Sequence, residues 1–145
     1  MSGTWILVAH RGGAHIYLSD GPKEPWELVE SHDHPDGRLK DGDIDTDAPG
    51  QNIDRGAPRN YDRSERPTER VAANFARELA QRLTAARNEG AFDRLVLVAA
   101  PTFLGHLRDS MDAPTAAMVV ESLDKNYPDP VPDVVRAALR ERIVV

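Results

Sequence analysis

The chain has 145 residues, a mass of 16.0 kDa, a net charge of −6 and no cysteine. This length suits one domain over residues 1–145, which can bury about two thirds of its extended-chain surface. The lack of cysteine excludes disulfides, thiolate metal ligands and cysteine nucleophiles. A pI of about 5.3 argues against non-specific coating of nucleic acid, which needs a basic surface.

Membrane insertion and secretion are not expected. No stretch approaches the roughly 18 apolar residues of a membrane span. The apolar run at residues 5–9 is too short for a signal peptide and has no basic segment before it. We therefore expect a cytoplasmic protein without membrane contact.

The first thirty residues predict three strands. Residues 4–9 form a continuous apolar run typical of a buried strand. Gly12 and Gly13 suit a tight turn, after which residues 14–18 return as the second strand of a hairpin. His10 and His15 flank this turn and are expected to face each other. Beyond a turn at residues 20–22, residues 26–30 predict a third strand.

From Ser31 to Arg66 the sequence shows no strand or helix periodicity, which predicts a long loop over about residues 34–66. Glycines and prolines are frequent there, and large apolar side chains are rare. Residues 31–54 carry seven acids against Arg38 and Lys40, whereas residues 55–70 carry five arginines against three acids. A structureless connection of this length inside a compact domain is usually functional or disordered.

A long helix is predicted from Pro67 to about Gly90, with apolar residues at spacings of three and four. Residues 95–100 predict a strand buried on both faces, and Pro101 opens a second helix. A helical turn at residues 113–117, a strand at 118–123 and a helix from Pro132 follow. This order predicts an α/β fold, a mixed five-stranded sheet with helices packed on its faces.

Several segments together resemble the bacterial host attachment protein family. They are residues 5–9, 14–17, 34–41, 74–80, 92–108 and 123–125, so the resemblance spans almost the whole chain. This family has been grouped with the middle domain of archaeo-eukaryotic peptide release factors. The resemblance implies an α/β fold of that type, with a mobile loop before the long helix.

Release factors carry a Gly-Gly-Gln motif on the corresponding loop, which acts at the peptidyl-tRNA ester. The nearest match here is Pro49-Gly50-Gln51, so the resemblance makes Gln51 a candidate catalytic residue. Proline replaces the first glycine, fixing φ and removing a backbone donor. A solvated turn is the alternative interpretation.

The arginine-rich part of the loop is a candidate RNA-binding element. Its arginines are spaced three or four residues apart, and a tyrosine among them is available to stack on a base. Acids alternate with these arginines, so an internally neutralised linker is the alternative. The candidate RNA-binding residues are Arg55, Arg59, Tyr61, Arg63, Arg66 and Arg70.

A second candidate site lies where the buried strand at residues 95–100 passes into the following helix. Free N–H groups at a helix N-terminus favour anions, and ligands of open α/β sheets bind beyond the carboxyl ends of strands. Thr102 adds a hydroxyl at this point and is a candidate anion-binding residue.

No metal or cofactor is expected. His32 and His34 alternate as half a metal site would, but no third ligand is spaced to join them. Asp43, Asp45 and Asp47 superficially resemble a calcium loop, yet Ala48 stands where that loop needs glycine.

The leading hypothesis is a non-catalytic binding domain that contacts the ribosome or another structured RNA through its charged loop. One alternative is a release-factor-like hydrolase of peptidyl-tRNA esters, in which Gln51 positions water. Another is a protein-interaction module that acts indirectly in attachment to host cells. The oligomeric state stays open.

Overall fold

The computed structural model describes residues 3–10, 12–21, 23–33, 67–127 and 132–143. Five strands form one sheet in the order β3-β2-β1-β4-β5. The antiparallel part consists of β1 (Gly3–His10), β2 (Gly13–Ser19) and β3 (Glu27–Asp33). β4 (Phe92–Val98) pairs in parallel with β1, and β5 (Val119–Leu123) pairs in parallel with β4. The predicted mixed five-stranded sheet is confirmed.

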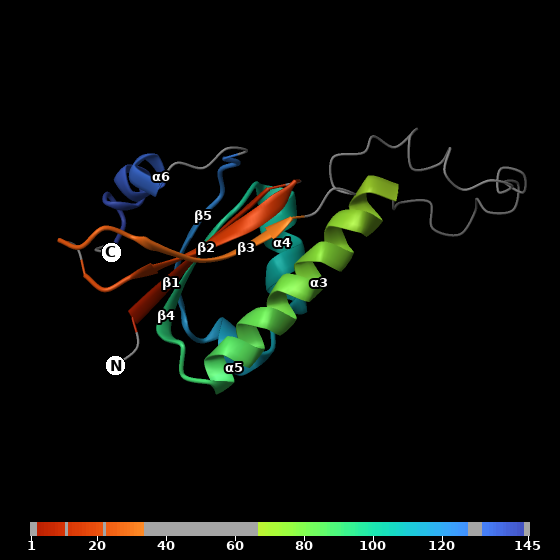
Figure 1. The fold of residues 1–145 in the computed structure, drawn as a ribbon. Coiled ribbons are helices and arrows are strands. Elements are labelled where there is room, and N and C mark those ends of the chain that lie inside the picture. The colour runs from red at the N-terminus through yellow and green to blue at the C-terminus, as the bar shows by residue number, and fades with distance from the viewer. Residues whose placement is uncertain (1–2, 11, 22, 34–66, 128–131, 144–145) are drawn as a thin grey trace, which may run out of the picture.

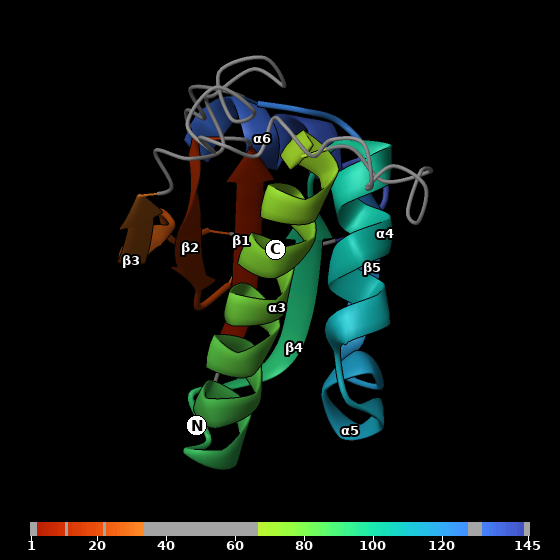
Figure 2. The same cartoon turned by 90° about the vertical axis from the view of Figure 1, so that its right-hand side faces the viewer.

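Helices cover both faces of the sheet (Figures 1 and 2). α3 (Pro67–Asn88) and α4 (Pro101–Ser110) pack side by side on one face, followed by the short α5 (Ala113–Ala116). α6 (Pro132–Leu139) lies on the other face. No helix among the described residues is long and apolar enough to cross a membrane.

β1 lies at the centre of two hydrophobic clusters because its successive side chains point to opposite faces. Trp5, Leu7 and Ala9 pack with the apolar stripe of α3 in the larger cluster. Ile6 and Val8 pack with α6 in the smaller one. The continuous apolar run at the start of the chain thus reflects burial on both faces.

α3 buries the side chains that the sequence periodicity predicts. Phe75, Leu79, Leu83 and Ala86 are buried against the sheet and α4, and Ala72 is half-buried. The helix ends before Gly90, whose φ of 75° is the left-handed conformation that glycine adopts without strain.

The hairpin between β1 and β2 requires glycine at position 13. A Cβ on Gly13 would approach the His32 carbonyl oxygen to 2.3 Å, so the neighbouring strand β3 leaves no room for one. The predicted hairpin is confirmed, with His10 paired to Gly13 across the turn. The rings of His10 and His15 lie 6.2 Å apart between centroids, facing each other as expected.

The third strand is longer than the sequence predicts. The sequence suggests residues 26–30, but β3 runs to Asp33, because residues 31–33 pair with 13–15 of β2 despite their polar side chains. Trp26 precedes the strand and is buried in the smaller cluster. The polar end of β3 therefore belongs to the sheet. The loop predicted over about residues 34–66 lies outside the described residues.

Candidate functional site

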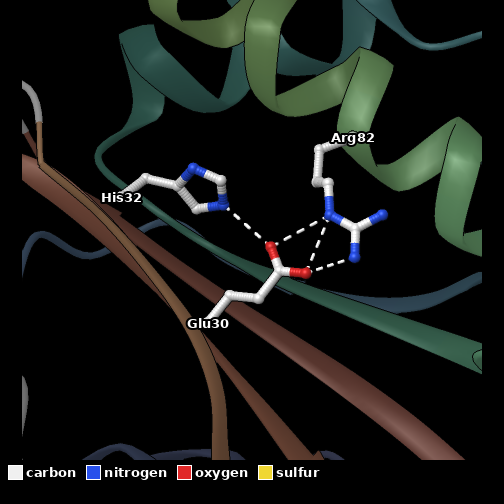
Figure 3. Close-up of polar contacts among 3 residues, drawn as sticks. All are labelled: Glu30, His32 and Arg82. Carbon is white, nitrogen blue, oxygen red and sulfur yellow. Dashed lines mark hydrogen bonds and ion pairs between the residues drawn. The ribbon is translucent and has the colours of Figure 1, made fainter.

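Glu30, His32 and Arg82 form a polar cluster between β3 and α3 (Figure 3). Glu30 and His32 are two residues apart on β3, so both point toward the face that α3 covers. Arg82 Nε donates to Glu30 Oε2 at 2.8 Å and to Oε1 at 3.0 Å, and its Nη2 also bonds Oε2. His32 Nε2 lies 2.9 Å from Glu30 Oε1.

The electrostatics of the cluster favour the charged forms of its ion pair. Hydrogen bonding from Arg82 lowers the pKa of Glu30, outweighing the opposing effect of burial, and His32 adds to the lowering. The same hydrogen bond raises the pKa of Arg82. The Arg82 guanidinium also lies 5.8 Å from the ring centroid of Trp5, within range of a cation–π contact.

Chemically, this arrangement is a fixed ion pair that ties the edge strand to the long helix. An ionised carboxylate that accepts hydrogen bonds from two partners has no proton to donate as a general acid. The side chains of His32 and Arg82 are each one-third exposed, whereas Glu30 between them is about one-fifth exposed. The sequence pairs His32 with His34 as half of a metal site, but His34 lies outside the described residues. Within the described ranges, no three His, Asp or Glu side chains gather as metal ligands would.

The exposed face of α3 carries a second set of polar side chains. Arg70, Asn74, Arg77 and Gln81 are all exposed, at spacings of three and four residues. At 100° per residue they fall within about 60° of one another around the helix axis and span about 16 Å along it. Arg77 Nη1 donates to Asn74 Oδ1 at 2.8 Å. We call these four residues the α3 polar stripe.

Arg70 was predicted as an RNA-binding residue, and its position is the start of this stripe, in the first turn of α3. The other candidate residues lie outside the described part of the chain. They are the catalytic candidate Gln51 and the RNA-binding candidates Arg55, Arg59, Tyr61, Arg63 and Arg66.

Thr102 lies where the sequence placed it, in the first turn of α4 just beyond the carboxyl end of β4. Its side chain is exposed. The N-cap residue is Ala100, which provides no side-chain hydrogen bond to the first turn. Anion binding at this helix start stays a prediction.

The sequence did not lead us to predict the polar cluster of Glu30, His32 and Arg82, although two features of the sequence are consistent with it. Glu30 and His32 share the helix-covered face of β3 once that strand is extended to Asp33. Arg82 directly precedes Leu83 on α3, so it borders the buried stripe. A charged residue at the border of a buried helix face often has a partner on the neighbouring element.

A sequence model of a protein family described as "Protein required for attachment to host cells" matches residues 5–139. The chain belongs to this family. Membership of this family was expected from the motifs at residues 74–80 and 92–108, among others, and the match confirms that expectation. A search of curated proteins found no match.

Two solved structures share the fold of this host-attachment protein. An archaeal protein aligns with a TM-score of 0.52 and 13% sequence identity, over 99% of this chain and 34% of its own. A crystal structure of an archaeal translation termination factor aligns with a TM-score of 0.51 and 10% identity, over 97% of this chain and 35% of its own. The chain thus spans about a third of each relative. The resemblance to release factors is confirmed as a shared fold.

Proposed function

We propose that this host-attachment family protein binds structured RNA, the ribosome first among candidates, through the α3 polar stripe and the arginine series before it. The observation that carries the proposal is the stripe itself. Arg70 and Arg77 are exposed one above the other on α3, and no acid lies between them on that face. Guanidinium groups in such a row suit contact with successive phosphates.

The charge distribution supports a local contact rather than a general one. The net charge of −6 repels nucleic acid from most of the surface. The stripe holds two arginines and two amides, which donate hydrogen bonds to phosphate and to 2′-hydroxyl groups. In the sequence, arginines at 55, 59, 63 and 66 continue the same series toward the N-terminal side of α3.

The choice of the ribosome as the first RNA to test comes from the shared fold. One of the two similar structures is a translation termination factor, and the chain matches about a third of it. A structural similarity at this low sequence identity establishes a shared fold, and it indicates only which function to test first.

The test is co-sedimentation of the full chain with purified ribosomes across a salt series. We expect binding at low salt that weakens as salt rises, because phosphate contacts release counterions. The double variant Arg70→Ala with Arg77→Ala should bind more weakly and should reduce the salt slope by about 2, because each arginine neutralises one phosphate.

A matched control removes two positive charges elsewhere. Lys125 and Arg140 are both exposed and lie off α3, so Lys125→Ala with Arg140→Ala changes the net charge equally. This control should bind like the unchanged protein. Equal weakening in both double variants, or no binding at low salt, would contradict the proposal.

A further inference from the structure

α3 and α4 lie side by side on the sheet, and one residue offset relates them along their length (Figure 2). The rings of Phe75 and Phe103 lie 5.9 Å apart between centroids. Further along, Arg87 Nε donates to Thr115 Oγ1 at 3.0 Å. Both pairs are 28 residues apart in the sequence. A residue of α4 therefore lies about level with the residue of α3 that precedes it by 28.

This offset places Arg77 of α3 beside the outer face of α4. Thr84 marks the side of α3 that faces the segment of α4 and α5, because its hydroxyl lies 3.5 Å from Asp112 Oδ1. Arg77 precedes Thr84 by seven residues, which is about 20° around a helix, so it projects toward the same side. Gly105 lies on α4 at the level of Arg77, and both residues are exposed.

Arg108 lies across α4 from Arg77, and each of the two guanidinium groups is held by an uncharged partner. Arg108 bonds the Ser122 hydroxyl, so its side chain is turned toward β5 and away from α3. Arg77 bonds the side-chain oxygen of Asn74. Among the described residues, no carboxylate forms an ion pair with either arginine. Both side chains therefore keep their full positive charge and further N–H donors.

The acids of the two helices lie at the margins of this surface. In residues 73–82, the part of α3 level with α4, the acid is Glu78. It precedes Arg82 by four residues, so it is turned toward β3. On α4 the acid is Asp109, about one turn beyond Gly105. The surface between the two arginines is therefore positive at the level of the glycine and ends one turn later.

Gly105 has no role in packing among the described residues. It lies in the middle of α4, where glycine weakens a helix relative to alanine. A Cβ at this position would meet no atom within 4 Å, so the fold leaves room for a side chain. Glycine does allow another backbone to approach closely. Thr102, exposed about one turn earlier, adds a hydroxyl that can bond a phosphate or a 2′-hydroxyl.

We propose that α4 is the second half of the RNA-binding surface. A sugar–phosphate backbone lies over Gly105, with Arg77 on one side and Arg108 on the other, and both guanidinium groups contact phosphates. This inference rests on the proposed function and adds a second helix to it. A protein partner fits this surface less well, because residues 101–110 expose no large apolar side chain that could anchor one.

A side chain added at Gly105 tests the close approach of RNA. Gly105→Gln should weaken co-sedimentation of the full chain with ribosomes by about tenfold or more, and should raise the Tm by about 2 °C. A purely structural role would not combine a more stable fold with weaker binding. The control Ala137→Gln adds the same side chain at an exposed position of α6, on the other face of the sheet, and should leave binding unchanged.

Removal of the Arg108 charge tests the phosphate contact. Arg108→Ala should weaken binding and reduce the salt slope by about 1, because one phosphate contact is lost. Arg140→Ala removes the same charge at an exposed position off α4 and should change neither quantity. Thermal melting of each variant checks that the fold is intact.

The outcomes separate this proposal from the proposed function. If the double α3 variant weakens binding while Gly105→Gln and Arg108→Ala do not, α3 binds RNA alone and the role of α4 is wrong. If the unchanged chain binds neither ribosomes nor protein-free ribosomal RNA, both proposals are wrong. Binding to ribosomes without binding to the protein-free RNA would indicate a ribosomal protein as the partner, and would also overturn the role of α4 in contacting RNA.

Discussion

Glu30 is the residue through which the edge strand β3 is held to the long helix. Its carboxylate accepts from Arg82 through both oxygens and also contacts His32. Only about a fifth of its side chain is exposed, so water replaces these bonds poorly when one partner is removed. If Glu30 is the partner removed, Arg82 would keep its position near Trp5 but would lose its Glu30 counter-ion on β3.

Replacing Glu30 by glutamine should lower the free energy of unfolding by about 1–2 kcal/mol at neutral pH. The pKa of Glu30 is lowered in the folded state, so the folded state binds its proton less readily than the unfolded state. The stabilisation is therefore present above the unfolded pKa and is lost as the pH falls through the folded pKa. Urea unfolding at neutral and at acidic pH should show the difference between Glu30→Gln and the unchanged protein shrinking with acid.

The exposed Glu27 on the same strand provides the control for this measurement. Glu27→Gln removes the same charge from β3 without touching Arg82. A similar loss of stability for both variants, or a difference that persists at acidic pH, would show that the ion pair does not stabilise the fold.

Among the elements, the helices and buried strands were predictable and the polar strand end was not. The stripe of Phe75, Leu79 and Leu83 predicts α3 because a helix buries one face at a fixed period. Residues 31–33 carry no such pattern, since β3 is an edge strand held there by backbone pairing with β2. The Glu30 cluster depends on that pairing, so its geometry could not be reached from the sequence.

α6 is anchored by one arginine rather than by its apolar face alone. Arg136 is 8% exposed and donates to the carbonyl oxygens of Gly21 at 3.0 Å and Glu24 at 2.6 Å. Its guanidinium also lies 5.8 Å from the ring centroid of Trp26. The helix is thereby fixed to the turn between β2 and β3.

Changing Arg136 to methionine should therefore destabilise the protein by about 2 kcal/mol, because the variant cannot make these two charge-assisted hydrogen bonds. Arg136→Lys should recover little of this, since an ammonium group lacks the planar fork that reaches both carbonyls. Hydrogen exchange of the α6 amides should accelerate in both variants. Arg140→Met, at an exposed position just after the helix, is the control and should change neither quantity. A normal exchange rate in Arg136→Met would show that apolar packing suffices.

At the scale of the whole molecule, the order of strands was the feature that the sequence left open. Three strands followed by helix–strand–helix–strand indicate a mixed sheet, but not that β4 pairs with β1. That pairing brings Phe92–Val98 beside a strand more than eighty residues earlier in the chain. It also makes β1 the centre of the sheet, between an antiparallel and a parallel neighbour.

This central position predicts where the fold is least tolerant of change. Leu7 is fully buried on β1 in the larger cluster, so Leu7→Ala should cost about 2–5 kcal/mol through poorer packing and the cavity left behind. Native domains are stable by only about 5–15 kcal/mol, so this cost should visibly shift the urea midpoint. Leu28 is 53% exposed on the edge strand, and Leu28→Ala should change the free energy of unfolding by less than about 0.5 kcal/mol. The two variants shorten a leucine side chain at the centre and at the edge of the sheet, so they compare the two positions directly. Equal losses of stability would contradict the burial of β1 between two helical layers.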